Sequence, residues 1–222
     1  MIGLVTGSLP FAGLPTNPAQ TVLGHIEGMT IEGIDIVTQA TPVSYAQLPG
    51  LLTDLVLKYR PAFVLALGLA LGAPVVRVEK VAINAADFGV ADNEGAKPEG
   101  GVRFAQNDAA ARLATWDAEA VVAAILEADV PARVSYHAGT HLCNLTLFTY
   151  LAALAGAGLD APCGFLHLPY LPDQIVWMMR HRAGTGEAPG LSFDQPSMAL
   201  ETQVNAVKAA LGALARQARA RP

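Results

Sequence analysis

Cysteine is scarce in this chain: Cys143 and Cys163 are the only two among 222 residues, and they do not form a C-x-x-C pair. Two cysteines cannot build the framework of several disulfides that holds small secreted domains together. The lack of a C-x-x-C pair also argues against a structural zinc site and a thioredoxin-like redox motif. We therefore interpret both cysteines as free thiols, and the sequence implies no metal and no organic cofactor.

Charged residues are also few, at 15% of the chain, and they form no basic cluster. The 14 Lys and Arg residues are outnumbered by 19 Asp and Glu residues, which gives a formal net charge of −5. Proteins that bind nucleic acid neutralise its phosphates with a clustered face of Lys and Arg. We therefore expect no nucleic-acid partner. The basic residues near the C-terminus suit the negative end of a helix dipole.

No apolar run in the sequence is suited to crossing a membrane, although 52% of the residues are hydrophobic. Residues 63–76 carry no charge, but they are shorter than the ~20 residues that a spanning helix needs and contain two glycines and a proline. Residues 134–159 are uncharged but are interrupted by polar side chains and by Gly139. The start of the chain lacks the basic region and cleavage-like site of a secretory signal. We therefore expect no membrane span and a cytoplasmic location.

The length and the apolar pattern predict a single α/β domain over residues 1–222. Strand-like and helix-like segments alternate, and several strands are continuous apolar runs, as expected when helices cover both faces of a sheet. The predicted architecture is a three-layer α/β/α sandwich around a mixed, largely parallel, twisted sheet. Strands are predicted near residues 2–6, 31–39, 62–67, 75–83, 132–136 and 163–168, and helices near residues 17–26, 44–59, 117–128, 143–156 and 197–218.

Two segments rich in glycine, proline and polar residues are predicted as surface loops. They are residues 88–108 and residues 182–192. Long loops in a compact domain are often lids or binding loops. Each segment is therefore a candidate for covering a ligand, and an irregular crossing without such a role is the alternative.

Cys143 lies in a sequence setting that suits nucleophilic chemistry. Residues 133–144 predict a short β-branched strand, a turn at Gly139 and the start of a helix at the thiol. At a helix N-terminus, unpaired backbone N–H groups and the helix dipole favour the thiolate, which is the form that attacks carbonyl groups. The backbone N–H groups of Leu142 and Cys143 are then the expected donors to an oxyanion.

Two further segments supply groups that such a thiol needs. Residues 165–169 predict a buried strand that carries His167, a side chain able to move protons near neutral pH. Residues 78–84 predict a strand with Glu79, and a carboxylate can fix the tautomer of a catalytic imidazole and stabilise its cation. The alternative is that Cys143 is a small buried hydrophobic residue and His167 a core histidine.

Together these segments resemble the pyroglutamyl peptidases, a family of cysteine peptidases that remove an N-terminal pyroglutamate. Members carry a Glu, Cys and His triad in that chain order, within E-[KR]-x-A-x-N, S-x-x-A-G-x-x-x-C-[DN] and F-[IL]-H-x-P. The matching segments here are residues 79–84, 135–144 and 165–169. Matches to the family's N-terminal T-G-F-x-P-F-G-G…N-P loop and to its D-N-x-G and P-Y-L-P motifs extend the resemblance over roughly residues 1–180.

The resemblance implies one catalytic domain that hydrolyses its substrate through a thioester acyl-enzyme. Glu79, Cys143 and His167 would form the catalytic triad. The implied partners are peptides with an N-terminal pyroglutamate, and a second copy or three further copies of this chain in a homodimer or homotetramer. No cofactor is implied. The residues implied to form the substrate pocket are Gly7, Phe11, Gly13 and Asn17.

The chain departs from the family pattern around this pocket. Ser8 stands where the family loop usually has a second aromatic residue, and Gly89 stands where members commonly have an arginine. These departures leave two alternatives open: a related cysteine amidohydrolase with a shifted acyl specificity, and a weakly active or non-catalytic binding relative. Smaller departures are Ala12 for glycine, Arg77 for serine or threonine, His137 for a small residue and His141 for an aromatic residue.

Overall fold

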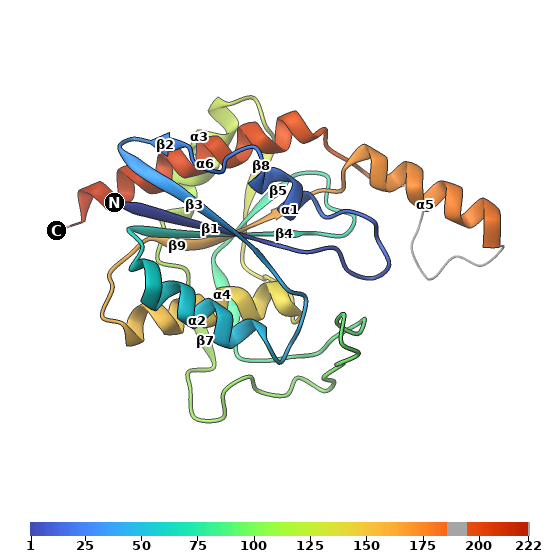
Figure 1. The fold of residues 1–222 in the computed structure, drawn as a ribbon, viewed down its shortest axis with the longest axis horizontal. Helices are drawn as coiled ribbons and strands as arrows, with labels where there is room; N and C mark the ends of the chain where they lie inside the picture. The colour runs from blue at the N-terminus through green and yellow to red at the C-terminus, as the bar shows by residue number, and fades with distance from the viewer. Residues whose placement is uncertain (186–194, 222) are drawn as a thin grey trace.

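The chain folds around a seven-stranded sheet, as the computed structural model shows for residues 1–185 and 195–221 (Figure 1). Neighbouring strands are parallel except at two places, where one edge strand and one inner strand run antiparallel to a neighbour. The mixed, largely parallel sheet expected from the sequence is therefore confirmed. In spatial order the strands are β2 (Thr30–Ile31), β3 (Ile34–Thr41), β1 (Ile2–Ser8), β4 (Phe63–Leu69), β9 (Cys163–Leu168), β5 (Val76–Glu79) and β8 (Ala132–Ser135).

Helices cover both faces of this sheet, which confirms the three-layer α/β/α sandwich (Figure 1). On one face, a hydrophobic core joins the sheet to the first, third and sixth helices. On the other face, a second core joins it to the second and fourth helices. The bounds of these helices are α1 (Pro18–Leu23), α2 (Leu48–Tyr59), α3 (Ala118–Glu127), α4 (Leu142–Gly156) and α6 (Leu200–Ala220).

The two central strands are apolar apart from His167, because both of their faces are covered. All seven residues of β4 and all six of β9 are buried, including His167 at the end of β9. Burial of apolar surface contributes about 25 cal/mol per Å², so these strands supply much of the driving force that holds the layers together. The side chain of His167 on β9 is therefore held between the neighbouring strands β4 and β5.

The structure corrects one predicted strand, near residues 75–83, which is two strands in two sheets. β5 ends at Glu79, and β6 (Val81–Ile83) pairs antiparallel with β7 (Ala111–Leu113) in a separate two-stranded sheet. The break falls at Lys80, whose backbone N–H donates to Ser135 O and whose carbonyl accepts from Ala114 N. An alternating pattern cannot show at which residue a strand exchanges one partner strand for another. The short strands β7 and β2 were not predicted as separate strands.

The structure also contains a helix that was not predicted, α5 (Pro172–Thr185), which extends away from the sheet (Figure 1). Its sequence signals were present, because Pro172 occupies the first turn and Asp173 lies at the positive end of the helix dipole. The side chain of Gln174 accepts from Leu171 N at 2.8 Å and completes the cap. The loop predicted over residues 182–192 is therefore wrong for its first four residues, while residues 186–192 lie outside the described residues.

The loop predicted over residues 88–108 is confirmed, and it is anchored at its start. Phe88 is buried, and its ring packs edge-on against Tyr45 with centroids 5.6 Å apart. The buried carboxylate of Asp92 accepts from the backbone of Tyr45, Glu94 and Ala96, and these hydrogen bonds lower its pKa despite the opposing effect of burial. The part of the loop next to Phe88 is therefore held in a fixed position.

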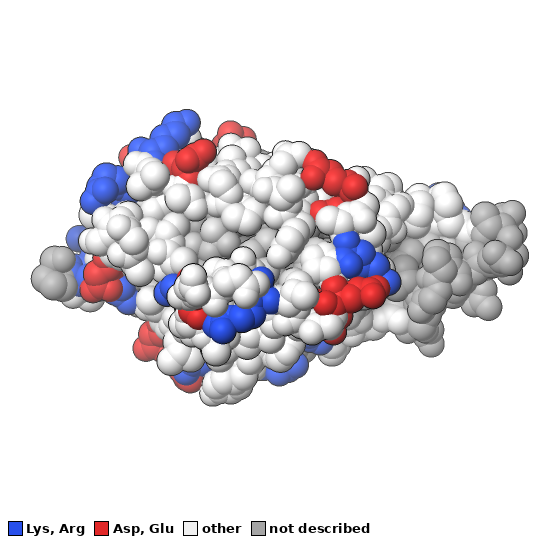
Figure 2. Space-filling view, turned by 90° about the horizontal axis from the view of Figure 1, so that it is seen from below, with Lys and Arg blue, Asp and Glu red and all other residues white. Residues whose placement is uncertain are grey.

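The surface carries charges of both signs without a continuous basic patch on the face shown in Figure 2. Lys and Arg side chains on this face lie among Asp and Glu side chains and wide uncharged areas. No helix among residues 1–185 and 195–221 combines the length and the apolar character needed to cross a bilayer.

Candidate active site

Cys143 is the second residue of α4, as the sequence predicted. The residue before the helix, His141, is extended, and its side chain makes no capping hydrogen bond. The first backbone N–H groups of a helix have no partner within the helix, and they carry the positive end of its dipole. The backbone N–H groups of Leu142 and Cys143 therefore belong to a turn that can accommodate negative charge.

Asn144 fixes the start of α4 against β6, a role that the sequence analysis missed. Its buried side chain accepts from Ile83 N at 2.8 Å and donates to Ile83 O at 2.8 Å and Ala85 O at 3.3 Å. An amide makes both kinds of hydrogen bond at once, so it pairs with an exposed strand edge as another strand would. The signal in the sequence was that Asn144 directly follows Cys143, at the [DN] position of the family motif.

His167 and Glu79 form a buried pair on the neighbouring strands β9 and β5. Nδ1 of His167 lies 2.8 Å from Oε1 of Glu79, whose carboxylate is fully buried. Burial alone lowers the pKa of His167, but electrostatic interactions and hydrogen bonds with Cys143 and Glu79 outweigh it and raise that pKa to about 9. These contacts favour the protonated imidazole and place it beside the thiol of Cys143.

The thiol and the imidazole meet above Gly68 of β4. Gly68 lies opposite His167 in the sheet, and a Cβ added there would be 2.9 Å from Cys143 Sγ and 2.6 Å from Phe165 Cζ. Such distances are too short for ordinary contacts, so only glycine leaves room for the thiol and the ring in these positions. No feature of the sequence marked Gly68 for this role, because β4 is apolar throughout.

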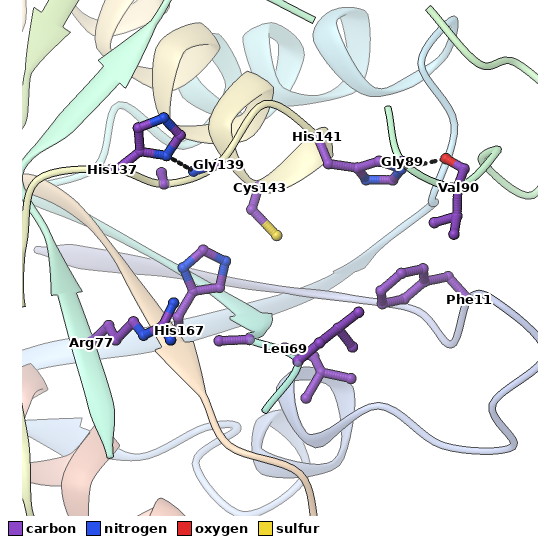
Figure 3. A pocket seen from close by; sticks show the side chains of 13 residues that line it. Phe11, Leu69, Arg77, Gly89, Val90, His137, Gly139, His141, Cys143 and His167 are labelled. Carbon is purple, nitrogen blue, oxygen red and sulfur yellow. Dashed lines mark hydrogen bonds between the residues drawn. The ribbon is translucent and has the colours of Figure 1, made fainter. Parts of the chain in front are cut away.

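A cavity of about 380 Å³ opens beside the thiol and the imidazole (Figure 3). This volume is within the usual range for small-molecule sites. Figure 3 shows Cys143 and His167 facing each other at the centre of the cavity. Among the described residues, no group of three or more His, Cys, Asp or Glu side chains is placed to hold a metal ion. The cavity is lined by Phe11, Leu69, Ala70, Leu71, Arg77, Gly89, Val90, His137, Ala138, Gly139, His141, Cys143 and His167.

One wall of the cavity is aromatic and apolar. Phe11 lies beside His141 with ring centroids 6.0 Å apart, and His141 packs on Phe88 at 4.0 Å. Nε2 of His141 is 3.1 Å from Val90 O, and burial lowers the pKa of this imidazole. The neutral ring therefore donates to Val90 O and joins the loop after Phe88 to the start of α4. In the sequence, His141 was noted only as a departure from an aromatic position of the family, and the structure places it in the cavity wall.

The other pocket residues predicted from the N-terminal loop are not in the cavity lining. Asn17 is buried at the start of α1, where its side chain accepts from Ala19 N and donates to Leu9 O, both at 3.0 Å. Gly7 lies against α1, and a Cβ there would be 2.4 Å from Ala19 O. Gly13 has a φ of 73°, and the preceding Ala12 also has a positive φ of 53°. These residues shape the loop that carries Phe11. Ser8 is not among the lining residues either.

Two residues that depart from the family pattern do line the cavity. Gly89 has open space where a side chain would begin, and its φ lies outside the left-handed region. Arg77 of β5 lies opposite His167 in the sheet, and its Nε is buried without a hydrogen-bond partner. Gly89 thus lacks the arginine that family members commonly have at this position, and Arg77 supplies a cation elsewhere in the same cavity.

Comparison with known proteins agrees with this geometry. The family model described as pyroglutamyl peptidase matches residues 1–217. A pyrrolidone-carboxylate peptidase of Thermococcus kodakarensis is 38% identical over 199 residues, covering 90% of this chain and 88% of that protein. A pyrrolidone-carboxylate peptidase of Ralstonia nicotianae is also 38% identical, over 208 residues, covering 94% of this chain and 90% of that protein.

A solved structure shows the same architecture over almost the whole chain. The crystal structure of pyrrolidone carboxyl peptidase from Pyrococcus furiosus superposes with a TM-score of 0.88 at 28% sequence identity. The superposition covers 98% of this chain and all of that one. The match of the family model over residues 1–217, together with relatives of this identity and coverage, leads to one conclusion: the chain belongs to the pyroglutamyl peptidase family.

Proposed function

We propose that this chain is a cysteine peptidase that removes pyroglutamate from the N-terminus of peptides. The observation that supports it most directly is the placement of Cys143 at a helix start, facing His167, which is in turn bonded to Glu79 at 2.8 Å. A nucleophile, a proton carrier and an orienting carboxylate thereby meet at one cavity. Family membership supplies the substrate class.

In the proposed reaction, the thiolate of Cys143 attacks the carbonyl carbon of the pyroglutamyl residue. The developing oxyanion accepts hydrogen bonds from the backbone N–H groups of Leu142 and Cys143. His167 then protonates the departing amine, which leaves a thioester on Cys143. A water molecule, deprotonated by the now neutral His167, attacks the thioester and releases free pyroglutamate and the thiolate. Glu79 holds Nδ1 of His167, so that Nε2 carries the transferred proton.

The lactam ring is proposed to bind against the apolar wall that contains Phe11. This ring is flat and small, and an aromatic face is a suitable surface for it. Asn17, Gly7 and Gly13 are proposed to contribute through the shape of the loop, since the side chain of Asn17 is already bonded to Ala19 N and Leu9 O. Hydrogen bonds from the lactam would then go to backbone groups of this loop and of the loop after Phe88.

A related cysteine amidohydrolase with a shifted acyl specificity is the second candidate. It is favoured by the altered cations of the cavity, where Gly89 has no side chain and Arg77 adds a guanidinium. The test is a panel of chromogenic pyroglutamyl, prolyl and acetyl amides at a measured enzyme concentration. Our proposal expects pyroglutamyl amide to be preferred by a wide margin. A preference for another acyl group would establish the second candidate, and slow turnover of every amide with slow thiol labelling would indicate a non-catalytic relative.

We further propose that residues 1–222 act as one catalytic domain in a reducing, cytoplasmic compartment. A free thiol that must stay reduced for catalysis is suited to such a compartment, and Cys143 and Cys163 are both free. We also propose that the chain forms a homodimer or homotetramer. Val176 and Met179 of α5 are 45% and 50% exposed on a helix that extends from the body, and pairing with another copy would bury them. Light scattering of the purified protein tests the oligomeric state.

A further inference from the structure

Arg77 places a positive charge on one side of the catalytic pair, and the aromatic wall lies on the other side. The sheet order β4-β9-β5 puts His167 between the end of β4, where Leu69 lines the cavity, and Arg77 of β5. Figure 3 shows the same division, with Phe11, Val90 and His141 on one side of Cys143 and with Arg77 and His137 on the other. The cavity therefore has an apolar half and a basic half.

The side chain of Arg77 is available to a ligand. Arg77 and His167 are paired directly across β5 and β9, so both side chains lie on the face of the sheet that carries the thiol. Nε of Arg77 is buried and makes no hydrogen bond, and no described residue forms an ion pair with the guanidinium. A buried donor without a partner is costly, which favours an acceptor supplied by a ligand.

The two halves of the cavity suit the two products of the proposed reaction. If the lactam lies against Phe11, the amine that leaves the pyroglutamyl carbonyl carbon must depart on the side of Arg77 and His137. The first residue of the leaving peptide extends about 3.5 Å along the chain from the scissile nitrogen. Its own carboxyl groups therefore lie within reach of a guanidinium on the neighbouring strand, and guanidinium and carboxylate form strong paired hydrogen bonds.

We propose that Arg77 is a specificity-determining residue that selects substrates with a carboxylate on the residue directly after pyroglutamate. This inference rests on the proposed function and deepens it. The carboxylate has two possible sources, an acidic side chain on that residue or the free C-terminus of a pyroglutamyl dipeptide. His137 lies in the same half of the cavity. Its Nδ1 accepts from Gly139 N at 2.9 Å, so its Nε2 carries the proton and is a second donor.

The test compares four substrates that differ only in the carboxylate. Pyroglutamyl-glutamate amide and pyroglutamyl-glutamine amide differ in the side chain, and pyroglutamyl-alanine and pyroglutamyl-alanine amide differ in the C-terminus. Values of kcat/KM are measured by the release of free pyroglutamate. We expect the acidic member of at least one pair to be preferred by about tenfold or more, the contribution of one charge-assisted hydrogen bond. The pair that shows the preference identifies the source of the carboxylate.

Three variants assign the preference to Arg77. Arg77→Gln should reduce the preference to about one, while Arg77→Lys, which keeps the charge, should retain part of it. Arg133→Gln is the matched control, because Arg133 lies opposite Arg77 on β8 but is exposed and outside the cavity lining. This control should keep the full preference.

The inference and the proposed function fail in different ways. Equal turnover of both members of each pair by the wild type would overturn the role of Arg77 and leave the peptidase activity intact. An equal fall of kcat/KM with all four substrates in Arg77→Gln would also overturn the role of Arg77 in specificity, because a general structural role would have that effect. No release of pyroglutamate from any of the four would overturn the proposed function and this inference together.

Discussion

Replacement of Gly68 by alanine is expected to reduce turnover because it displaces the catalytic thiol. The added Cβ would lie 2.9 Å from Cys143 Sγ and 2.6 Å from Phe165 Cζ. Non-bonded carbon atoms prefer separations of about 3.5–4.0 Å, so the sulfur must retreat by roughly 0.5–1 Å. A misplacement of about 1 Å in an active site can cost on the order of 100-fold in rate. We therefore expect kcat/KM for a pyroglutamyl amide to fall by about 10- to 100-fold.

Gly3→Ala is the matched control for this change. Gly3 lies on the adjacent strand β1, and its added Cβ would be 2.3 Å from Phe63 Cζ, far from the thiol in the layer of α1 and α6. Both variants overpack the core, which typically costs about 1–3 kcal/mol. Urea unfolding gives the stability of each variant, and kcat/KM is measured at a temperature where both are folded. Gly3→Ala should lose stability and keep its activity per folded molecule, whereas Gly68→Ala should lose both.

The reasoning would be refuted by Gly68→Ala molecules that are folded and turn over substrate as the wild type does. Equal losses of activity in Gly68→Ala and Gly3→Ala would also refute it, because the effect would then follow from core strain in general. Recovery of part of the activity in a double variant, Gly68→Ala with Phe165→Leu, would show how the strain is shared between the ring and the sulfur.

Three further predictions concern the catalytic pair and the cavity. His167→Ala should lower kcat by several orders of magnitude and Glu79→Gln by less, since the carboxylate orients a proton carrier that remains; full activity of Glu79→Gln at every pH would reduce the triad to a dyad. The kcat/KM of the wild type should fall as pH rises through about 9, because deprotonated His167 cannot protonate the leaving amine; a decline centred near 6.5 would contradict the raised pKa. Gly89→Arg should change the free energy of unfolding by less than about 0.5 kcal/mol, because the added side chain meets open space and the backbone needs no left-handed conformation; a loss above about 2 kcal/mol in urea unfolding would contradict this.

The layers of the fold could be predicted because apolar periodicity reports directly on burial. β4 and β9 are buried on both faces, and His167 is their one polar side chain. The helix that begins at the thiol could be predicted from the turn at Gly139 and the apolar run after it. The break between β5 and β6 could not, since both strands alternate in the same way and only their partners differ.

The chemistry of the site could be predicted from its motifs, but its walls could not. Three separate motifs marked Glu79, Cys143 and His167, and the structure brings these side chains together. Gly68 had no such mark, since its importance lies in the side chains that approach it from β9 and α4. Asn17 was predicted to help form the substrate pocket, and its side chain caps the start of α1 beside the loop that carries Phe11. A motif indicates that a residue has a role, whereas the packing around the residue shows what that role is.

A thioester between Cys143 and the pyroglutamyl group can be detected directly during turnover. Enzyme that is turning over a pyroglutamyl ester is quenched with acid, digested, and analysed by mass spectrometry for the peptide that carries Cys143. We expect a mass increase of one pyroglutamyl group at Cys143, its absence in Cys143→Ala, and its presence in Cys163→Ser, because Cys163 is fully buried in β9. Attachment at another residue, or turnover that persists in Cys143→Ala, would show that Cys143 is not the nucleophile.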